Sequence, residues 1–410
     1  MKFALQARTV LTTIVAALLA TVSVDAQVAI RGTRIYTMNG PMIENGVVVI
    51  RDGKIAAVGP AASTPIPEGF RVLEAAVVTP GLVDAHSVMG LAGQLNDDKA
   101  DQDQLERSEP MQPELRALDA YNPQERLIEW VRGFGVTTVH TGHAPGEAIS
   151  GMTMIVKTRG DTVDDALVVE PAMLAGTLDP SATKEDKESP GTRGKLMAIL
   201  RQQFIDAQDY RAKRGLDDPE MQPARNLRLD AIGRVLKREI PLILTAHRAQ
   251  DIASALRFAE EFKIRLVLDG AAESYLVAEK IAKAKVPVVL HPTMARAYGE
   301  TENLSFETAG KLRAAGVTVA LQSGYESYVP KTRVILFEAG IAAANGLTFE
   351  QALATITRDA AAVLGIGERV GRLAVGMDGD VALYDGDPFE YTTHCIGTVI
   401  EGEVVSTAVR

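Results

Sequence analysis

Most histidines of this sequence fall where a strand is expected to end. The chain has 410 residues and six histidines. An imidazole can transfer protons near neutral pH or bind a metal ion through a ring nitrogen. Such groups meet at one edge of a sheet when they follow parallel strands, which is where barrel enzymes place their chemistry. The side chains with this expected placement are His86, His140, His143, His247, His291 and Asp269.

The middle of the chain has the pattern that would position these groups. Short apolar segments alternate with amphipathic ones, which is typical of parallel strands joined by helices. The expected strands are residues 77–85, 136–141, 155–158, 166–169, 242–246, 265–269, 286–291 and 317–322. The expected helices are residues 124–134, 195–214, 250–262, 273–284 and 306–315, and a capping box at Thr348 and Gln351 predicts one more.

Both ends of the mature chain are rich in short strand-like segments. Asp52-Gly53 near the start and Glu401-Gly402 near the end are spaced as tight hairpin turns. We therefore expect residues 27–78 and 366–410 to form one composite β-sandwich. Residues 79–365 are expected to form a (β/α)8 barrel of the TIM type, which makes the chain an α/β protein.

The first 26 residues have the composition of a secretory signal peptide. Lys2 and Arg8 precede an apolar run at residues 10–22, and small residues follow at 24–26. The sequence predicts a periplasmic or secreted protein with no membrane attachment after cleavage, and an uncleaved anchor is the alternative. A formal net charge of -10 argues against nucleic acid as a partner. Cys395 is the one cysteine, so no internal disulfide is expected.

One motif connects the chain to a known family. The run Thr79-Pro80-Gly81-Leu82-Val83-Asp84-Ala85-His86 resembles the first barrel strand of the amidohydrolase superfamily. Residues 45–59, 135–139, 248–252 and 370–388 resemble further parts of it, so the likeness covers nearly all of the mature chain. The chain is most similar to the imidazolonepropionase-like branch. The resemblance implies hydrolysis of non-peptide C–N bonds in cyclic amides or small dipeptides.

The same resemblance shows which metal ligands are missing. The family holds a divalent metal that lowers the pKa of bound water from about 15.7 to about 7. His86 is the retained position, but Val88 stands where a second His is expected, and Thr245 replaces the His of the fifth strand. Asp269 stands in place of a His on the sixth strand. Gly324 occupies the position of the eighth-strand Asp, which binds metal and relays the proton.

A rebuilt metal site is the competing interpretation of the same residues. His247, Asp269 and His291 are weaker candidate ligands beside His86, and the expected pocket-lining residues are His140, His143, Thr245, Gly324 and Glu326. Lys157 resembles, less closely, the carbamylated lysine of two-metal relatives. His394 falls in the expected sandwich and is assigned a structural or exposed role.

Two functional hypotheses follow from these residues. In the first, the chain is a catalytically degenerate homologue that binds a small ligand or partners an active paralogue. It then forms either a homodimer or a heterodimer with that paralogue. In the second, it is an active metal-dependent hydrolase of cyclic amides or small dipeptides. The cofactor is then none in the first case, or one divalent ion of Zn, Fe or Mn in the second.

Overall fold

The computed structural model describes residues 27–93, 102–184, 188–291, 297–325 and 335–410. The expected signal peptide and Glu326 lie outside these ranges. Within them, no helix has the length and apolar character that crossing a membrane requires.

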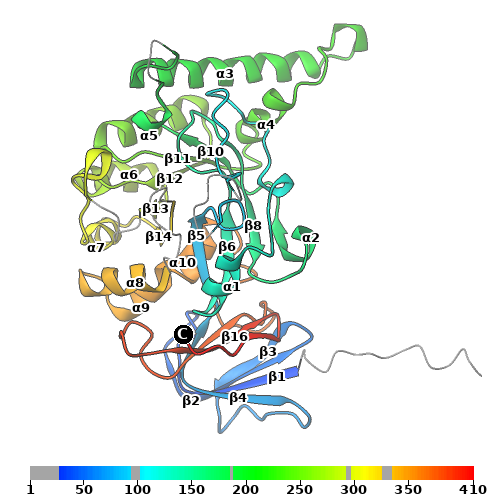
Figure 1. Cartoon of the computed structure of the whole chain (residues 1–410), viewed down its shortest axis with the longest axis vertical. Helices are drawn as coiled ribbons and strands as arrows, with labels where there is room; N and C mark the ends of the chain where they lie inside the picture. Colours follow the sequence, from blue (N-terminus) through cyan, green and yellow to red (C-terminus); the bar gives the residue numbers. More distant parts are fainter. Residues whose placement is uncertain (1–26, 94–101, 185–187, 292–296, 326–334) are drawn as a thin grey trace, which may run out of the picture.

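The two ends of the chain share one sheet, which lies below the rest of the molecule in Figure 1. Its order is β17-β16-β15-β4-β1-β2-β3, and the antiparallel pairing of β15 with β4 joins the C-terminal strands to the N-terminal ones. Asp52 and Gly53 both have positive φ and connect β2 to β3, which confirms the predicted hairpin. The strands are β1 (Gln27–Ile35), β2 (Ile43–Arg51), β3 (Lys54–Pro60), β4 (Arg71–Pro80), β15 (Val381–Tyr384), β16 (Cys395–Ile400) and β17 (Glu403–Ser406).

The middle of the chain contributes two further sheets. One has the order β5-β6-β8-β9 and contains β5 (Leu82–Ser87), β6 (Val136–Thr141), β8 (Met154–Lys157) and β9 (Leu167–Val169). The other has the order β14-β13-β12-β11-β10-β7 and contains β7 (Gly151–Met152), β10 (Leu174–Thr177), β11 (Leu242–Thr245), β12 (Leu266–Gly270), β13 (Val288–Leu290) and β14 (Val319–Leu321). A parallel bridge between Ser87 and Gly324 brings the two sheets together.

The expectation of parallel strands holds for most of this region but is wrong for residues 155–158 and 166–169. Neighbours from β10 to β14 are parallel, and so are β5 and β6. In contrast, β8 is antiparallel to both β6 and β9. Residues 142–153, which include β7, connect β6 to β8, and they contain no helix that would return the chain to the other end of the sheet.

The helices pack around these sheets (Figure 1). Thr348 and Gln351 form the predicted capping box at the start of α9. The α-helices are α1 (Arg126–Arg132), α2 (Val163–Ala166), α3 (Arg193–Arg214), α4 (Leu227–Leu236), α5 (Ala249–Phe262), α6 (Ala278–Ala284), α7 (Thr308–Ala314), α8 (Ile335–Ala344), α9 (Phe349–Thr355) and α10 (Arg358–Val363). Short 3-10 helices are η2 (Ala117–Asp119), η3 (Pro180–Ala182), η4 (Pro219–Met221), η5 (Ser274–Val277) and η6 (Gly299–Thr301).

Alternate residues of the central strands face a common interior. Val83 and Ala85 of β5 pack in one buried cluster with Ile243, Val267 and Ala320 of β11, β12 and β14. Because side chains alternate along a strand, the residue two positions after each of Ile243, Val267 and Ala320 faces the same interior. Those residues are Thr245, Asp269 and Gln322. This register brings the side chains of Thr245, Asp269 and Gln322 into contact.

Lys157 lies at the junction with the seven-stranded sheet, which contradicts its interpretation as a metal-bridging lysine. Its buried ammonium group forms ion pairs with Asp378 and Asp380, in the segment that precedes β15. Asp378 is also paired with Lys54 of β3 at 2.5 Å. Because β8 is antiparallel to β6, Lys157 pairs with Thr138 near the start of β6, away from the strand ends that carry His86 and Asp269.

Candidate functional site

The strand ends meet around Asp269, a buried carboxylate at the end of β12. Its Oδ1 accepts hydrogen bonds from His86 Nδ1 at 2.9 Å and from Gln322 Nε2 at 2.8 Å. Its Oδ2 accepts a hydrogen bond from Thr245 Oγ1 at 2.6 Å. Both carboxylate oxygens are therefore engaged by side chains from β5, β11 and the residues after β14.

An irregularity in β5 directs His86 into this network. The pairing of β5 with β6 shifts register between Asp84 and Ser87, and such bulges re-aim a side chain. The buried Asp84 carboxylate accepts hydrogen bonds from the backbone N–H groups of His86 and Ser323. It thereby ties the end of β5 to the segment after β14. Burial raises the pKa of Asp84 to about 6, despite these hydrogen bonds.

His86 and Asp269 stabilise each other in their charged forms. Burial acts to lower the pKa of His86, but the negative charge and the hydrogen bond of Asp269 outweigh it, so the pKa is raised. Burial acts to raise the pKa of Asp269, but the His86 charge and the hydrogen bonds from His86, Thr245 and Gln322 leave it lowered. The pair thus favours a protonated imidazole beside an ionised carboxylate.

His140 lies in the same region, and both of its ring nitrogens are occupied. Nδ1 donates to the carbonyl of Ala85 at 2.8 Å, so Nε2 accepts from the hydroxyl of Thr153 at 2.6 Å. Burial lowers the pKa of His140 to about 3. The expected pocket-lining role is therefore replaced by a structural one, in which a neutral imidazole connects β6 to β5 and to the residue before β8.

His143, two residues after β6, is buried with no hydrogen-bond partner for either ring nitrogen among the described residues. Burial lowers its pKa to about 4, which keeps the imidazole neutral. Nε2 of His86 likewise lacks a partner of good geometry in the described part of the chain, although the backbone near His143 adds to its raised pKa. Both ring nitrogens of His143 are therefore buried polar atoms without a described partner at this edge.

His247 and His291 do not join the Asp269 network through any described contact. The half-buried His247 ring packs over the α-carbon of Gly270, where an added Cβ would lie 2.5 Å from it. His291 is buried, and its backbone N–H donates to the carbonyl of Gly270. Both residues thus pack around the positive-φ turn at the end of β12.

Val88 and Gly324 have taken on structural roles at the positions where the resemblance places metal ligands. Val88 is buried in a small apolar cluster with Ala92 and Ala144, and Leu105 and Tyr325 pack against it. Gly324 has φ +71 and donates its backbone N–H to the carbonyl of His86 at 3.1 Å. Both positions therefore help to close the end of β5.

Residues 102–105, here called the strap, cover this end of β5 and β6. Ala92 and Gln102 form an antiparallel bridge, Asp103 N–H donates to the carbonyl of Leu91, and Ala144 N–H donates to that of Gln104. Burying a leucine or valine side chain stabilises by roughly 1.5–3 kcal/mol, but Leu105 is only half-buried. Gln102 Nε2 and Gln104 Oε1 lack partners among the described residues, and each such atom costs about 1–3 kcal/mol.

Sequence reasoning missed Gln322 and the contacts that the strap makes. Gln322 is two residues beyond the inward-facing Ala320, so strand alternation was a signal that its amide faces the interior. The strap carried no such signal, because its contacts with residues 88–92 and 144 are set by the tertiary structure. The apolar Leu105 within the polar segment 96–109 was the one local hint.

The comparisons with known proteins agree on the family. Residues 114–406 match the sequence model described as the amidohydrolase family. This chain belongs to the amidohydrolase family. Imidazolonepropionase from Stenotrophomonas maltophilia is 27% identical over 376 residues, which covers 84% of this chain and 87% of that protein. The predicted superfamily and its imidazolonepropionase-like branch are thereby confirmed.

Other members of the family match over different lengths. The amidohydrolase tasK from Hapsidospora irregularis is 22% identical across 85% of this chain, but the match spans only 38% of that protein. Among solved structures, an amidohydrolase from Thermotoga maritima MSB8 superposes with a TM-score of 0.86 and 27% identity. That comparison covers 93% of this chain and 100% of the Thermotoga chain.

The donors at the strand ends of this amidohydrolase-family chain do not fit a divalent metal. A family metal centre needs several imidazole and carboxylate donors with free lone pairs. Asp269 already accepts three hydrogen bonds, both nitrogens of His140 are engaged, and Val88 offers no lone pair. Across the described ranges, no three or more His, Cys, Asp or Glu side chains are grouped as a metal site would require.

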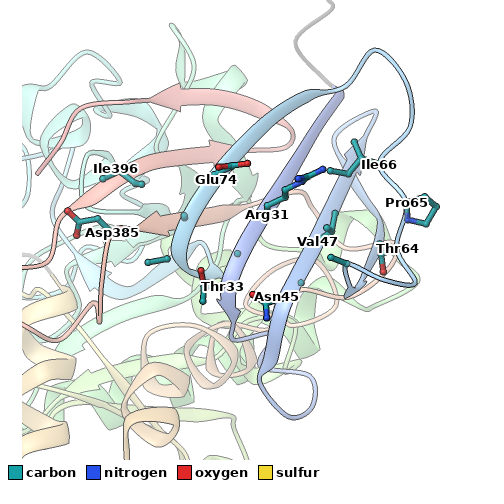
Figure 2. A pocket seen from close by; sticks show the side chains of 15 residues that line it. Arg31, Thr33, Asn45, Val47, Thr64, Pro65, Ile66, Glu74, Asp385 and Ile396 are labelled. Carbon is teal, nitrogen blue, oxygen red and sulfur yellow. The ribbon is translucent and has the colours of Figure 1, made fainter.

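A groove on the seven-stranded sheet of this amidohydrolase-family chain is unrelated to that chemistry. It measures about 810 Å³ and is lined by residues of β1, β2 and β4 together with the loop before β4. Figure 2 shows that Arg31, Glu74 and Asp385 are spread along its sides and do not converge on one point. None of the predicted site residues lines it, so the strand ends around Asp269 remain the candidate site.

Proposed function

We propose that this member of the amidohydrolase family has lost hydrolysis and retains the fold as a binding protein. The observation that carries the proposal is the engagement of both Asp269 carboxylate oxygens by His86, Thr245 and Gln322. In a hydrolytic centre of this family the lone pairs at the strand ends hold a metal that generates hydroxide near neutral pH. Here the Asp269 carboxylate and both ring nitrogens of His140 are engaged in internal hydrogen bonds, and Gly324 supplies no base.

The proposed architecture is a closed barrel attached to a composite domain of the two chain ends. The Ser87–Gly324 bridge supports closure between β5 and the end of β14. Hydrogen bonds from Thr153 and Ser150 to Met173 and Ala175 support continuity between β8 and β10. We place the composite domain, a β-sandwich in the proposal, at residues 27–78 and 366–410 and the barrel at residues 79–365.

The proposed ligand is a small molecule, and the proposed partner is a second copy or an active paralogue. Residues 1–26 support export to the periplasm or the medium, because their composition is that of a signal peptide. Imidazolonepropionases and an Xaa-Pro dipeptidase are among the similar proteins, which supports a cyclic amide or a small dipeptide as the ancestral substrate class.

A metal-dependent hydrolase of those same substrates is the second candidate. The observation that favours it is the set of buried nitrogens without described partners, namely His86 Nε2, both nitrogens of His143, and His247 Nδ1. Imidazole nitrogens are the commonest ligands of zinc and also suit iron. A rearrangement of these rings would be needed to build such a site.

Metal analysis of the purified protein separates the two candidates. The full chain is dialysed against a weak chelator, and Zn, Fe and Mn are then measured by inductively coupled plasma mass spectrometry. Lactams and Xaa-Pro dipeptides are assayed with each metal added. We expect well under one metal per chain and no turnover. One tightly held ion per chain that is lost in His86→Ala, together with amide cleavage, would establish the hydrolase.

A further inference from the structure

The strap packs against the two segments that follow β5 and β6, each close in sequence to a predicted site histidine, His86 or His143. Leu105 packs on Val88, two residues beyond His86, and approaches Gly146, three residues beyond His143. The backbone N–H of Ala144, adjacent to His143, donates to the carbonyl of Gln104. His143 is buried in this arrangement although neither of its nitrogens has a described partner.

The closed strap is held by opposing contributions of similar size. Its backbone hydrogen bonds to Leu91 and Ala144 and the apolar contact of Leu105 favour closure. The side-chain amides of Gln102 and Gln104 each bury an atom without a described partner, and His143 buries two. Opening would return the two amide atoms of Gln102 and Gln104 to water, so the closed state carries a polar cost that most surface loops avoid.

We propose that the strap is a gate that opens locally and controls access to His86 and His143. Local opening needs few contacts to break, because the segment has no regular secondary structure beyond the bridge at Gln102. A molecule that supplies a hydrogen-bonding group to His143 would remove part of the polar cost. The gate depends on the proposed binding function in one respect, namely that the ring nitrogens of His86 and His143 contact the bound ligand.

A disulfide across the bridge tests the gate. Ala92 and Gln102 face each other in an antiparallel bridge, where Cα atoms lie about 4.5–5.5 Å apart, and this range suits a disulfide. The variant Ala92→Cys/Gln102→Cys is prepared in the full chain, in an oxidised and a reduced form. The native Cys395 is buried and is not one of the two cysteines to be joined. Diethyl pyrocarbonate, which modifies neutral imidazole, is the probe. Mass spectrometry follows its addition at His143, with the half-exposed His394 as an internal reference.

The gate predicts a definite order of modification rates at His143. The oxidised variant should react about tenfold more slowly than the reduced one, and Leu105→Ala about tenfold faster than the unmodified protein, since Leu105 is only half-buried. Leu216→Ala, at an exposed leucine after α3, is the matched control and should leave the rate unchanged. Equal rates at His143 in the oxidised, reduced and Leu105→Ala proteins would overturn the proposal.

Hydrogen exchange of the unmodified protein tests the same proposal without a variant. The amide of Asp103 donates to the carbonyl of Leu91, and the amide of Ala144 donates to the carbonyl of Gln104. Hydrogen exchange at both amides should occur through local opening of the strap and depend little on denaturant concentration. Exchange of both amides only through global unfolding would overturn the gate. Metal content is unaffected by either result, so failure of the gate is distinguishable from failure of the proposed function.

Discussion

The imidazole Nδ1 of His86 lies 2.9 Å from Oδ1 of Asp269, and both side chains are almost fully removed from solvent. The two residues are 183 positions apart in the sequence. A second His–Asp pair, His394 with Asp385, has the same 2.9 Å separation but is half-exposed. The protein thus contains a buried and an exposed version of one interaction.

Removing Asp269 should destabilise the protein strongly. Asp269→Ala leaves the buried side chains of His86, Thr245 and Gln322 without their shared acceptor, and breaking a buried pair typically costs about 3–5 kcal/mol. Asp385→Ala should change the free energy of unfolding by no more than about 1 kcal/mol, because solvent screens the exposed pair. Urea denaturation of both variants measures the difference, and similar losses would contradict the proposed importance of burial.

The pH dependence of stability should carry a contribution from His143. Its pKa falls from 6.5 to about 4 on folding, so the unfolded chain binds more protons between these values and stability decreases as pH falls from 6.5 towards 4. Between pH 6.5 and 4, the free energy of unfolding should fall by about 3 kcal/mol less in His143→Phe than in the unmodified protein. The raised pKa of Asp84 acts in the opposite sense, so the two proteins must be compared at each pH. Parallel curves would show that His143 is not buried neutral.

Restoring the family ligands should restore metal binding. Val88→His, Thr245→His and Gly324→Asp together supply the donors that the resemblance places there. If a complete site contributes roughly 10–16 kcal/mol, each ligand accounts for about 3. The triple variant should therefore bind about one Zn²⁺ per chain, and Val88→His alone should not, as judged by calorimetric titration. The positive φ of Gly324 makes Asp there somewhat strained. No binding by a folded triple variant would show that the strand ends have moved apart.

The buried lysine at the junction of the sheets should be essential for stability. Lys157→Met leaves Asp380 without its described cation, while Asp378 keeps Lys54. We expect a loss of about 3 kcal/mol in the free energy of unfolding. Lys237→Met removes an exposed lysine of the same length and is the control. An equal, small effect of both changes would contradict the role assigned to Lys157.

Local patterns were sufficient for several parts of the structure. The Asp52-Gly53 hairpin and the capping box of Thr348 and Gln351 were correctly predicted, because each depends on a few neighbouring residues. The direction of β8 was not predictable in this way. Its three apolar residues and one lysine suit a parallel or an antiparallel neighbour equally. The direction of the strand is set by the partner with which it pairs.

The sequence by itself identified the family and placed Val88, Thr245 and Gly324 where the resemblance expects ligands, since the donor atoms of a side chain are a property of the residue type. The tertiary structure decided what the remaining groups do. His86 is paired with Asp269, both nitrogens of His140 are occupied, and Lys157 lies at the junction of two sheets. Such partners come from strands far apart in the chain, so strand register and side-chain direction select them, and no short-range pattern encodes either.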